Sequence, residues 1–179
     1  MEIEVIYANT AKLTGILDGE WEEKFQQGNR QLVGNVLLVT GRNAKKINRI
    51  PLLAYESDVM QEKKSRPVTA EGHFSVRGDD RYVFLTSPEV PCDVELGVNQ
   101  VTISGNLRKD KRWGKDRRGK TFLTFSIFTQ VRTMGFILPC IAWEDKAVSI
   151  FAKDWEVSIE GCLQNHPYFG VQILVERII

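Results

Sequence analysis

Asn99-Gln-Val-Thr-Ile-Ser-Gly105 repeats a pattern found ninety residues earlier, at Asn9-Thr-Ala-Lys-Leu-Thr-Gly15. Two further segments recur in the same order: Ile50-Pro-Leu-Leu-Ala-Tyr-Glu56 as Leu138-Pro-Cys-Ile-Ala-Trp-Glu144, and Glu71-Gly72 as Glu160-Gly161. The three spacings are 90, 88 and 89 residues. Repeats in one order at nearly one spacing indicate two copies of a module of about 80 residues.

The composition is that of a globular protein, with 42% hydrophobic and 26% charged residues. Cys92, Cys140 and Cys162 are widely spaced and form no C-x-x-C pair, so we expect reduced thiols and neither a disulfide framework nor a zinc site. The N-terminus is acidic, and no apolar run approaches the roughly 18 residues of a membrane helix. We therefore expect a cytoplasmic protein without a membrane partner.

Each copy is predicted to consist of three strands, a short helix and two further strands. In the second copy, residues 121–131 alternate between two faces, with Leu123, Phe125 and Ile127 on one of them. The elements expected there are Val98–Leu107, Thr121–Val131, Phe136–Ala142, the helix Trp143–Ala152, Glu156–Leu163 and Val171–Ile178. Those of the first copy are Ala11–Leu17, Leu32–Thr40, Ile47–Ala54, a charged segment Tyr55–Lys64, Val68–Phe74 and Tyr82–Thr86.

Five short strands with a helix between the third and the fourth form the layout of the oligonucleotide/oligosaccharide-binding barrel, the OB-fold. We therefore predict an all-β protein of two tandem OB-fold five-stranded Greek-key barrels, each with one short helix between strands 3 and 4. The first copy spans residues 1–87 and the second spans residues 98–179. Residues 88–97, with Pro88 and Pro91, are predicted to be the linker.

Gly114-Lys-Asp-Arg-Arg-Gly-Lys-Thr121 fits G-x-x-x-x-G-K-[ST], the signature of loops that hold nucleotide phosphates. Such a loop opens a helix, whose N–H groups face the phosphates. Here the next residues, Phe122–Gln130, alternate and predict a strand. We therefore expect a hairpin rather than a nucleotide hydrolase. We also expect no catalytic residues, metal site or cofactor, because the two histidines lie in separate copies and the sequence indicates no catalytic constellation of paired carboxylates or of Cys and His.

The run Arg108–Lys120 holds eight Lys or Arg and two Asp, a net charge of +6 in a chain of net charge +1. Trp113 lies at its centre. Proteins that bind single-stranded nucleic acid typically combine cations that contact its phosphate backbone with rings that stack on its bases. A hairpin tip exposed to solvent would also explain the basic residues. The predicted phosphate contacts are Lys109, Lys111, Arg112, Lys115, Arg117, Arg118 and Lys120.

Several aromatic residues are candidates for base stacking. Tyr168 and Phe169 lie in the turn Gln164–Gly170, where rings are hard to bury. Phe122 and Phe128 lie on the strand face opposite the core set, and either base stacking or a subunit interface would explain them. We expect Phe151 and Trp155 in the core, while the pattern leaves Trp143 open.

The corresponding hairpin of the first copy, Asp18–Gln31, is acidic, with four acids and two bases. Such a hairpin would repel phosphate. The first copy is therefore predicted to bind nucleic acid weakly, or to serve in assembly or partner docking. Its weaker candidate residues are Trp21, Tyr55, Arg77 and Arg81.

Val98-Asn-Gln-Val-Thr-Ile-Ser-Gly-Asn-Leu107 resembles the first strand of the bacterial single-stranded DNA-binding protein (SSB) family, V-N-x-V-x-[IL]-x-G-N-L. The resemblance continues at Gly119–Thr129, Trp143–Ala147 and Ser158–Leu163. It covers residues 98–179 well and residues 8–86 more faintly. It implies that Trp143 and Tyr168 stack bases, as does approximately Phe136, where the spacing slips by one. The matching residues of the first copy are Tyr55 for Trp143 and Asp79 for Tyr168. It also implies a homodimer that presents four OB-folds.

Together these features predict a non-enzymatic, non-sequence-specific single-stranded DNA-binding protein acting in replication, recombination or repair. Replicative members of the resembling family end in an acidic tail, whereas this sequence stops at Val175–Ile179 inside the last predicted strand. This departure argues against a housekeeping role at the replication fork and leaves room for an accessory or mobile-element member, or for a relative of the primosomal proteins that have no such tail. Two alternatives stay open: a module that mainly docks a replication or recombination protein, and an RNA-binding protein.

Overall fold

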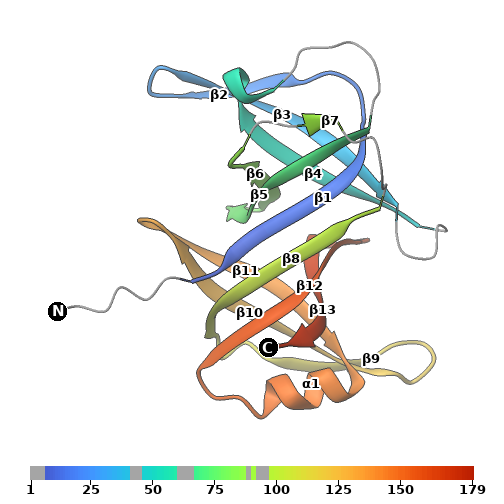
Figure 1. The fold of residues 1–179 in the computed structure, drawn as a ribbon. Coiled ribbons are helices and arrows are strands. Elements are labelled where there is room, and N and C mark those ends of the chain that lie inside the picture. The colour runs from blue at the N-terminus through green and yellow to red at the C-terminus, as the bar shows by residue number, and fades with distance from the viewer. Residues whose placement is uncertain (1–6, 41–45, 60–66, 88–89, 92–96) are drawn as a thin grey trace. The chain divides into compact units, whose positions relative to one another are not determined.

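The computed structural model describes residues 7–40, 46–59, 67–87, 90–91 and 97–179 (Figure 1). The chain divides into two compact units. The N-terminal unit comprises residues 10–100 and 163–171, and the C-terminal unit comprises residues 1–9, 101–162 and 172–179. The hairpin of residues 163–171 thus belongs to the N-terminal unit, although it joins the last two strands of the second copy.

The first copy forms a closed barrel of five strands: β1 (Asn9–Leu17), β3 (Arg30–Thr40), β4 (Ile47–Tyr55), β5 (Pro67–Arg77) and β6 (Asp80–Leu85). Strand β1 pairs antiparallel with both β3 and β5, and β4 pairs parallel with β6, which closes the barrel. The short strand β2 (Glu22–Gln27) extends the sheet beyond β3, and β7 (Val90–Pro91) pairs with β5. A single 3₁₀ turn, η1 (Glu56–Asp58), follows β4.

The second copy repeats this topology with β8 (Asn99–Leu107), β10 (Thr121–Val131), β11 (Met134–Trp143), β12 (Glu156–His166) and β13 (Gly170–Ile178). Strand β8 pairs with β10 and β12, and β11 pairs parallel with β13. Strand β9 (Arg112–Lys115) extends the sheet beyond β10, and helix α1 (Glu144–Phe151) follows β11.

Successive side chains of a strand point to opposite faces of the sheet, so every second residue of these strands faces the interior of its barrel. Leu13, Leu37 and Phe74 are fully buried in the first barrel, as are Ile103 and Leu138 in the second. The repeated motifs contain glycine because backbones cross there. A Cβ at Gly15 would overlap the carbonyl oxygen of Leu38, and one at Gly105 would overlap that of Phe128. These are the points where the first strand of each copy meets the second, so the glycines allow each barrel to close.

The predicted order of five strands is confirmed in both copies, and the second contains the predicted helix. In the first copy, Tyr55 ends β4, residues 56–59 contain only η1, and residues 60–64 lie outside the described residues. Strands β2 and β9 were not predicted, because every residue of β2 and all but one of β9 are exposed and neither follows an apolar alternation. No described helix is long and apolar enough to span a bilayer.

Candidate nucleic-acid interface

The segment Gly114–Thr121 that resembles a phosphate loop is a β-hairpin turn. It begins in β9 and ends in β10, and a strand rather than a helix follows it. The Asp116 carboxylate accepts hydrogen bonds from the backbone N–H groups of Arg118 and Lys120, both at 2.8 Å. Gly119 has a φ of 80°, in the left-handed region that favours glycine. Because Asp116 already occupies these N–H groups, the segment is not a nucleotide-phosphate cradle.

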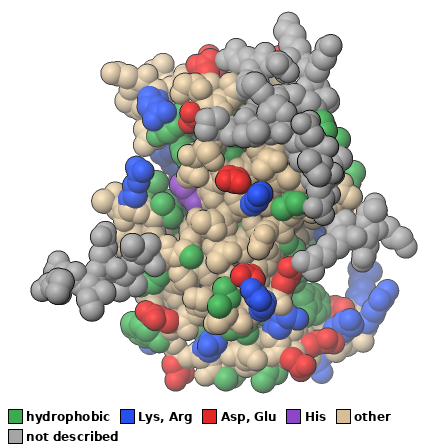
Figure 2. Space-filling model, in the orientation of Figure 1, with side chains coloured by type: hydrophobic (Ala, Val, Ile, Leu, Met, Phe, Trp, Pro, Cys, Tyr) green, Lys and Arg blue, Asp and Glu red, His purple; other side chains and the backbone are tan. Residues whose placement is uncertain are grey.

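The basic hairpin keeps its positive charge uncompensated. Its two acids bind other groups, since Asp116 organises the turn and Asp110 accepts from the Ser126 hydroxyl at 2.6 Å. Among the described residues, none of its eight Lys and Arg side chains forms an ion pair. Figure 2 shows blue side chains gathered where Figure 1 places β9. The hairpin can therefore attract polyanions.

One of the predicted cations has a structural contact. Lys111 is half-buried, and its ammonium donates to the carbonyl oxygens of Phe151 at 3.3 Å and Lys153 at 2.6 Å. A cation at the C-terminus of a helix complements the helix dipole and the free carbonyls there. Lys109, Arg112, Lys115, Arg117, Arg118 and Lys120 are exposed.

Phe122 and Trp143 form a ring pair on the outer face of the second barrel. Register places them opposite each other on β10 and β11, with ring centroids 5.0 Å apart. The Phe122 ring lies over Gly114 of β9, where a Cβ would overlap it. Phe128 lies on the same face of β10, and Arg112 pairs with Thr124 of that face. We call Phe122, Trp143 and Phe128 the outer ring face.

Trp113 points the other way. It pairs with Leu123, a fully buried core residue, so its side chain lies on the face of the sheet opposite the outer ring face. Its ring contacts Phe151 of α1, with centroids 5.2 Å apart, and remains 44% exposed. The rings predicted to stack bases are therefore divided between two faces of the β9–β10 hairpin.

The expectation that Phe151 and Trp155 lie in the core was wrong, because they are 50% and 71% exposed. Helix α1 has only two turns, and Ala147 and Ile150 are its buried residues. The sequence did not predict that Phe151 contacts Trp113. Phe151 directly follows the buried Ile150 on a helix, and this position could have indicated that its ring lies beside the core rather than in it.

Phe136 is only 8% exposed, since it pairs with the buried Thr129 on the core side of β10. Tyr168 and Phe169, by contrast, are 87% and 66% exposed. His166 Nδ1 accepts the backbone N–H groups of both, at 3.1 and 3.2 Å, and fixes their turn. Of the three, only Tyr168 and Phe169 present rings that a base could reach.

In the N-terminal unit, arginine side chains cover the rings of the first copy. The Arg30 guanidinium lies 3.4 Å from the centroid of Tyr55, and that of Arg77 lies 4.9 Å from the centroid of Phe25. These contacts are cation–π interactions. Trp21 is half-buried. An arginine therefore lies over each of these two rings.

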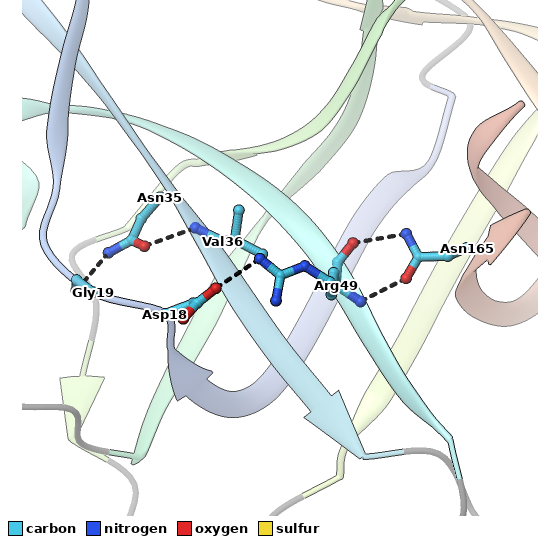
Figure 3. Close-up of polar contacts among 6 residues, drawn as sticks. All are labelled: Asp18, Gly19, Asn35, Val36, Arg49 and Asn165. Atoms are coloured by element: carbon cyan, nitrogen blue, oxygen red, sulfur yellow. Dashed lines mark hydrogen bonds and ion pairs between the residues drawn. The ribbon is translucent and has the colours of Figure 1, made fainter. Parts of the chain in front are cut away.

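Two further arginines of this unit, Arg49 and Arg81, also have contacts within it. Arg49 forms an ion pair with Asp18 at 2.6 Å, and its backbone exchanges two hydrogen bonds with the Asn165 amide (Figure 3). Arg81 donates to the Val171 carbonyl at 3.0 Å, and burial lowers the pKa of its guanidinium while Asp79 opposes that shift. Both arginines line a groove of about 700 Å³, together with acids that include Asp18 and Asp79.

Sequence comparison gives no relatives, since no family model and no curated protein matches this chain. Structural comparison does. The single-stranded DNA-binding protein from Thermus aquaticus matches with a TM-score of 0.74, 16% identity, and coverage of 98% of this chain and 93% of that chain. A deletion variant of the same protein matches with a TM-score of 0.78, 17% identity, and coverage of 97% and 94%.

At such low identity the match shows the fold alone. It extends over both copies, however, and agrees with the strand pairings of each barrel. Among the described residues, no group of His, Cys, Asp and Glu could hold a metal ion. The chain therefore has a tandem OB-fold, and the match to the Thermus aquaticus single-stranded DNA-binding protein covers nearly its whole length.

Proposed function

We propose that this protein binds single-stranded DNA without sequence specificity, mainly through the second copy. The observation that carries the proposal is the unpaired charge of the β9–β10 hairpin beside the outer ring face. When Lys and Arg side chains neutralise phosphates, the counterions of the nucleic acid are released, which favours binding. Aromatic rings stack on bases of any sequence. Both features occur together on one short strand and its neighbours.

The roles follow from the positions of the side chains. Arg112 lies on the outer ring face, and Arg117, Arg118 and Lys120 lie at or beside the turn. Phe122 and Trp143 are half-buried, so each ring is anchored while part of its surface stays open. An anchored ring loses little freedom when a base stacks on it, which favours binding. Tyr168 and Phe169 supply additional exposed rings in the turn of residues 163–171.

Titration with oligonucleotides tests the proposal, using quenching of the native tryptophan fluorescence. We expect single-stranded DNA to quench strongly and duplex DNA weakly, because duplex bases are not free to stack. If three to five cations each neutralise a phosphate, log affinity falls against log salt with a slope of about −2 to −4. A flat salt response would contradict the proposal. Tighter binding of RNA of the same sequence would favour the RNA-binding alternative instead.

The cellular role belongs to the same proposal. A protein that covers single strands would act in the cytoplasm during replication, recombination or repair, and we propose a homodimer that presents four OB-folds. Light scattering after size-exclusion chromatography measures the mass directly. A monomer at micromolar concentration would reject the dimer while leaving the binding proposal intact.

A second candidate function is the docking of a replication or recombination protein by the first copy. The observation that favours it is the hairpin of residues 18–31, whose acids Glu20, Glu22 and Glu23 are exposed. Changing all three to glutamine separates two roles. If the acids only repel DNA, affinity for single strands rises; if they dock a protein, DNA affinity is unchanged and activity in the cell is lost.

A further inference from the structure

A recess of about 620 Å³ lies between the β9–β10 turn and the first turn of helix α1. It is on the side of the hairpin away from the outer ring face, because Trp113 lines it. Its volume falls in the range of about 300–1,000 Å³ found for small-ligand sites. The residues that line it are Trp113, Arg118, Gly119, Lys120, Thr121, Glu144, Asp145 and Val148.

The recess has two charged walls of opposite sign. Arg118 and Lys120 form one wall, and neither has an ion-pair partner among the described residues. Glu144 and Asp145, in the first turn of α1, form the other. Trp113 and Val148 provide the apolar surface. Phe151 supports the Trp113 ring, 5.2 Å away. A cationic wall, an anionic wall and a ring together suit a ligand with a phosphate, a flat base and hydrogen-bond donors.

We propose that this recess holds one nucleotide of the bound strand. The phosphate contacts Arg118 and Lys120, and the base lies on Trp113. The exocyclic amino group of the base donates to Glu144 or Asp145. This inference rests on the proposed function and deepens it, because it adds a second contact surface and a base preference.

Continuity with the outer ring face supports the proposal. On β9, Arg112 and Gly114 face Phe122 and its neighbours, whereas Trp113 faces the recess. A single strand of nucleic acid that leaves the outer ring face and crosses β9, which has four residues, reaches the recess next. The unpaired cations lie at the turn between the two surfaces, where a backbone crossing from one to the other would pass.

The backbone at Glu144 supports the acidic wall. Its φ is 51°, a left-handed conformation that is uncommon for residues other than glycine and asparagine. Such strain is concentrated at functional sites, where surrounding structure maintains it. A glycine would adopt this conformation without strain, yet the sequence has a carboxylate directly beside Trp143 and facing the recess.

The proposal has a consequence for base preference. Carboxylates accept hydrogen bonds from the cytosine amino group, and thymine has no such donor. We therefore expect oligo(dC) to bind about two- to tenfold more tightly than oligo(dT) of equal length, the range of one hydrogen bond. Both are pyrimidine strands, so the stacking contributions are similar.

Changing both Glu144 and Asp145 to Ala tests the acidic wall, because Gln or Asn would keep an oxygen that accepts hydrogen bonds. Removing two negative charges raises affinity for both oligonucleotides, but the preference for oligo(dC) should fall to nearly none. Asp154→Ala is the control, because Asp154 is exposed and lies outside the recess. It should change affinity without changing the preference. An unchanged preference in the double variant would overturn the acidic wall.

Trp113→Ala and Phe151→Ala test the ring. Loss of a stacked base should weaken binding about 5- to 100-fold for Trp113→Ala. Phe151→Ala should weaken it less, and Trp113→Phe should restore most of it. Trp155→Ala is the control, because Trp155 is exposed and does not line the recess. Circular dichroism of each variant excludes unfolding.

The outcomes separate this inference from the function beneath it. If the unmodified chain binds neither oligonucleotide, the proposed function fails. If it binds both and Trp143→Ala weakens binding, while Trp113→Ala matches the unmodified chain, the recess proposal alone fails. Weakened binding in both variants, with loss of preference only in the acidic-wall variant, supports both.

Discussion

The first hairpins of the two copies occupy the same place in the topology, but they differ in whether their cations have partners. In the second copy, the hairpin cations have no ion-pair partner among the described residues. In the first copy, Lys24 lies 3.9 Å from Glu22, and Arg30 lies over Tyr55. Each cation there already has a contact within the unit.

One topology can therefore present either a ring covered by a cation or a ring without such a cover. Tyr55 and Trp143 follow the same strand in the two repeats, at the start of the segment between strands 3 and 4. An arginine covers one ring at 3.4 Å, whereas the other packs against a neighbouring phenylalanine and has no cation–π contact among the described residues. The same backbone position can therefore be open or closed to a base, depending on one side chain.

The largest expected effect comes from removing the unpaired cations. Arg117→Ala, Arg118→Ala and Lys120→Ala combined should weaken binding of single-stranded DNA about 100-fold at about 0.1 M salt, and should flatten the salt slope by about 2. Fluorescence titration at several salt concentrations measures both. Lys24→Ala and Arg30→Ala in the first copy are the matched control. If they weaken binding equally, the contrast between the hairpins has no functional meaning.

The second largest effect on binding should come from Trp143, and its counterpart in the first copy, Tyr55, should contribute less. Trp143→Ala removes an open stacking ring and should cost about 1–3 kcal/mol of binding free energy. Tyr55→Ala removes a covered ring, so its effect on binding should be much smaller. Thermal unfolding of both variants checks that neither barrel is lost. Equal losses of affinity would mean that both copies stack bases.

The matched core residues Leu52 and Cys140 should differ at alkaline pH. Burial, with a smaller contribution from Asp110, raises the pKa of the Cys140 thiol in the folded chain. The unfolded thiol titrates near pH 8.5. Stability is therefore full below that pH and decreases above it by about 1.4 kcal/mol per pH unit. Urea unfolding from neutral to alkaline pH measures this loss, and Cys140→Ala should remove this contribution. An identical pH dependence in the variant would assign the loss to other groups.

The smallest expected effect is the opening of the covered ring. Arg30→Ala should lower stability by about 0.5–1 kcal/mol, the value of an exposed cation–π contact. It should also expose Tyr55 and increase binding severalfold, which is most easily measured in a chain that carries Trp143→Ala. Arg30→Gln is the companion variant that retains a long polar side chain. A decrease in binding would show that Arg30 itself contacts phosphate.

The strands and their order could be predicted because burial imposes a period of two on residues such as those of 121–131. Strands β2 and β9 could not, because strands that extend a sheet into solvent need no apolar alternation. The stacking of Arg30 on Tyr55 joins residues 25 positions apart, and no local pattern indicates it. The side of the sheet on which Trp113 lies depends on the register of β9, which no sequence pattern specified.

The Asp116 turn has a kinetic consequence. The carboxylate holds the turn in one conformation before any ligand arrives, so capture of a strand requires little ordering of the chain. Association should then be fast and steered by charge, with a rate that falls as salt rises. Residence time should depend instead on the rings. Compared with Asp116→Asn, which removes the same charge but keeps an acceptor for the turn, Asp116→Ala should slow arrival while leaving departure nearly unchanged.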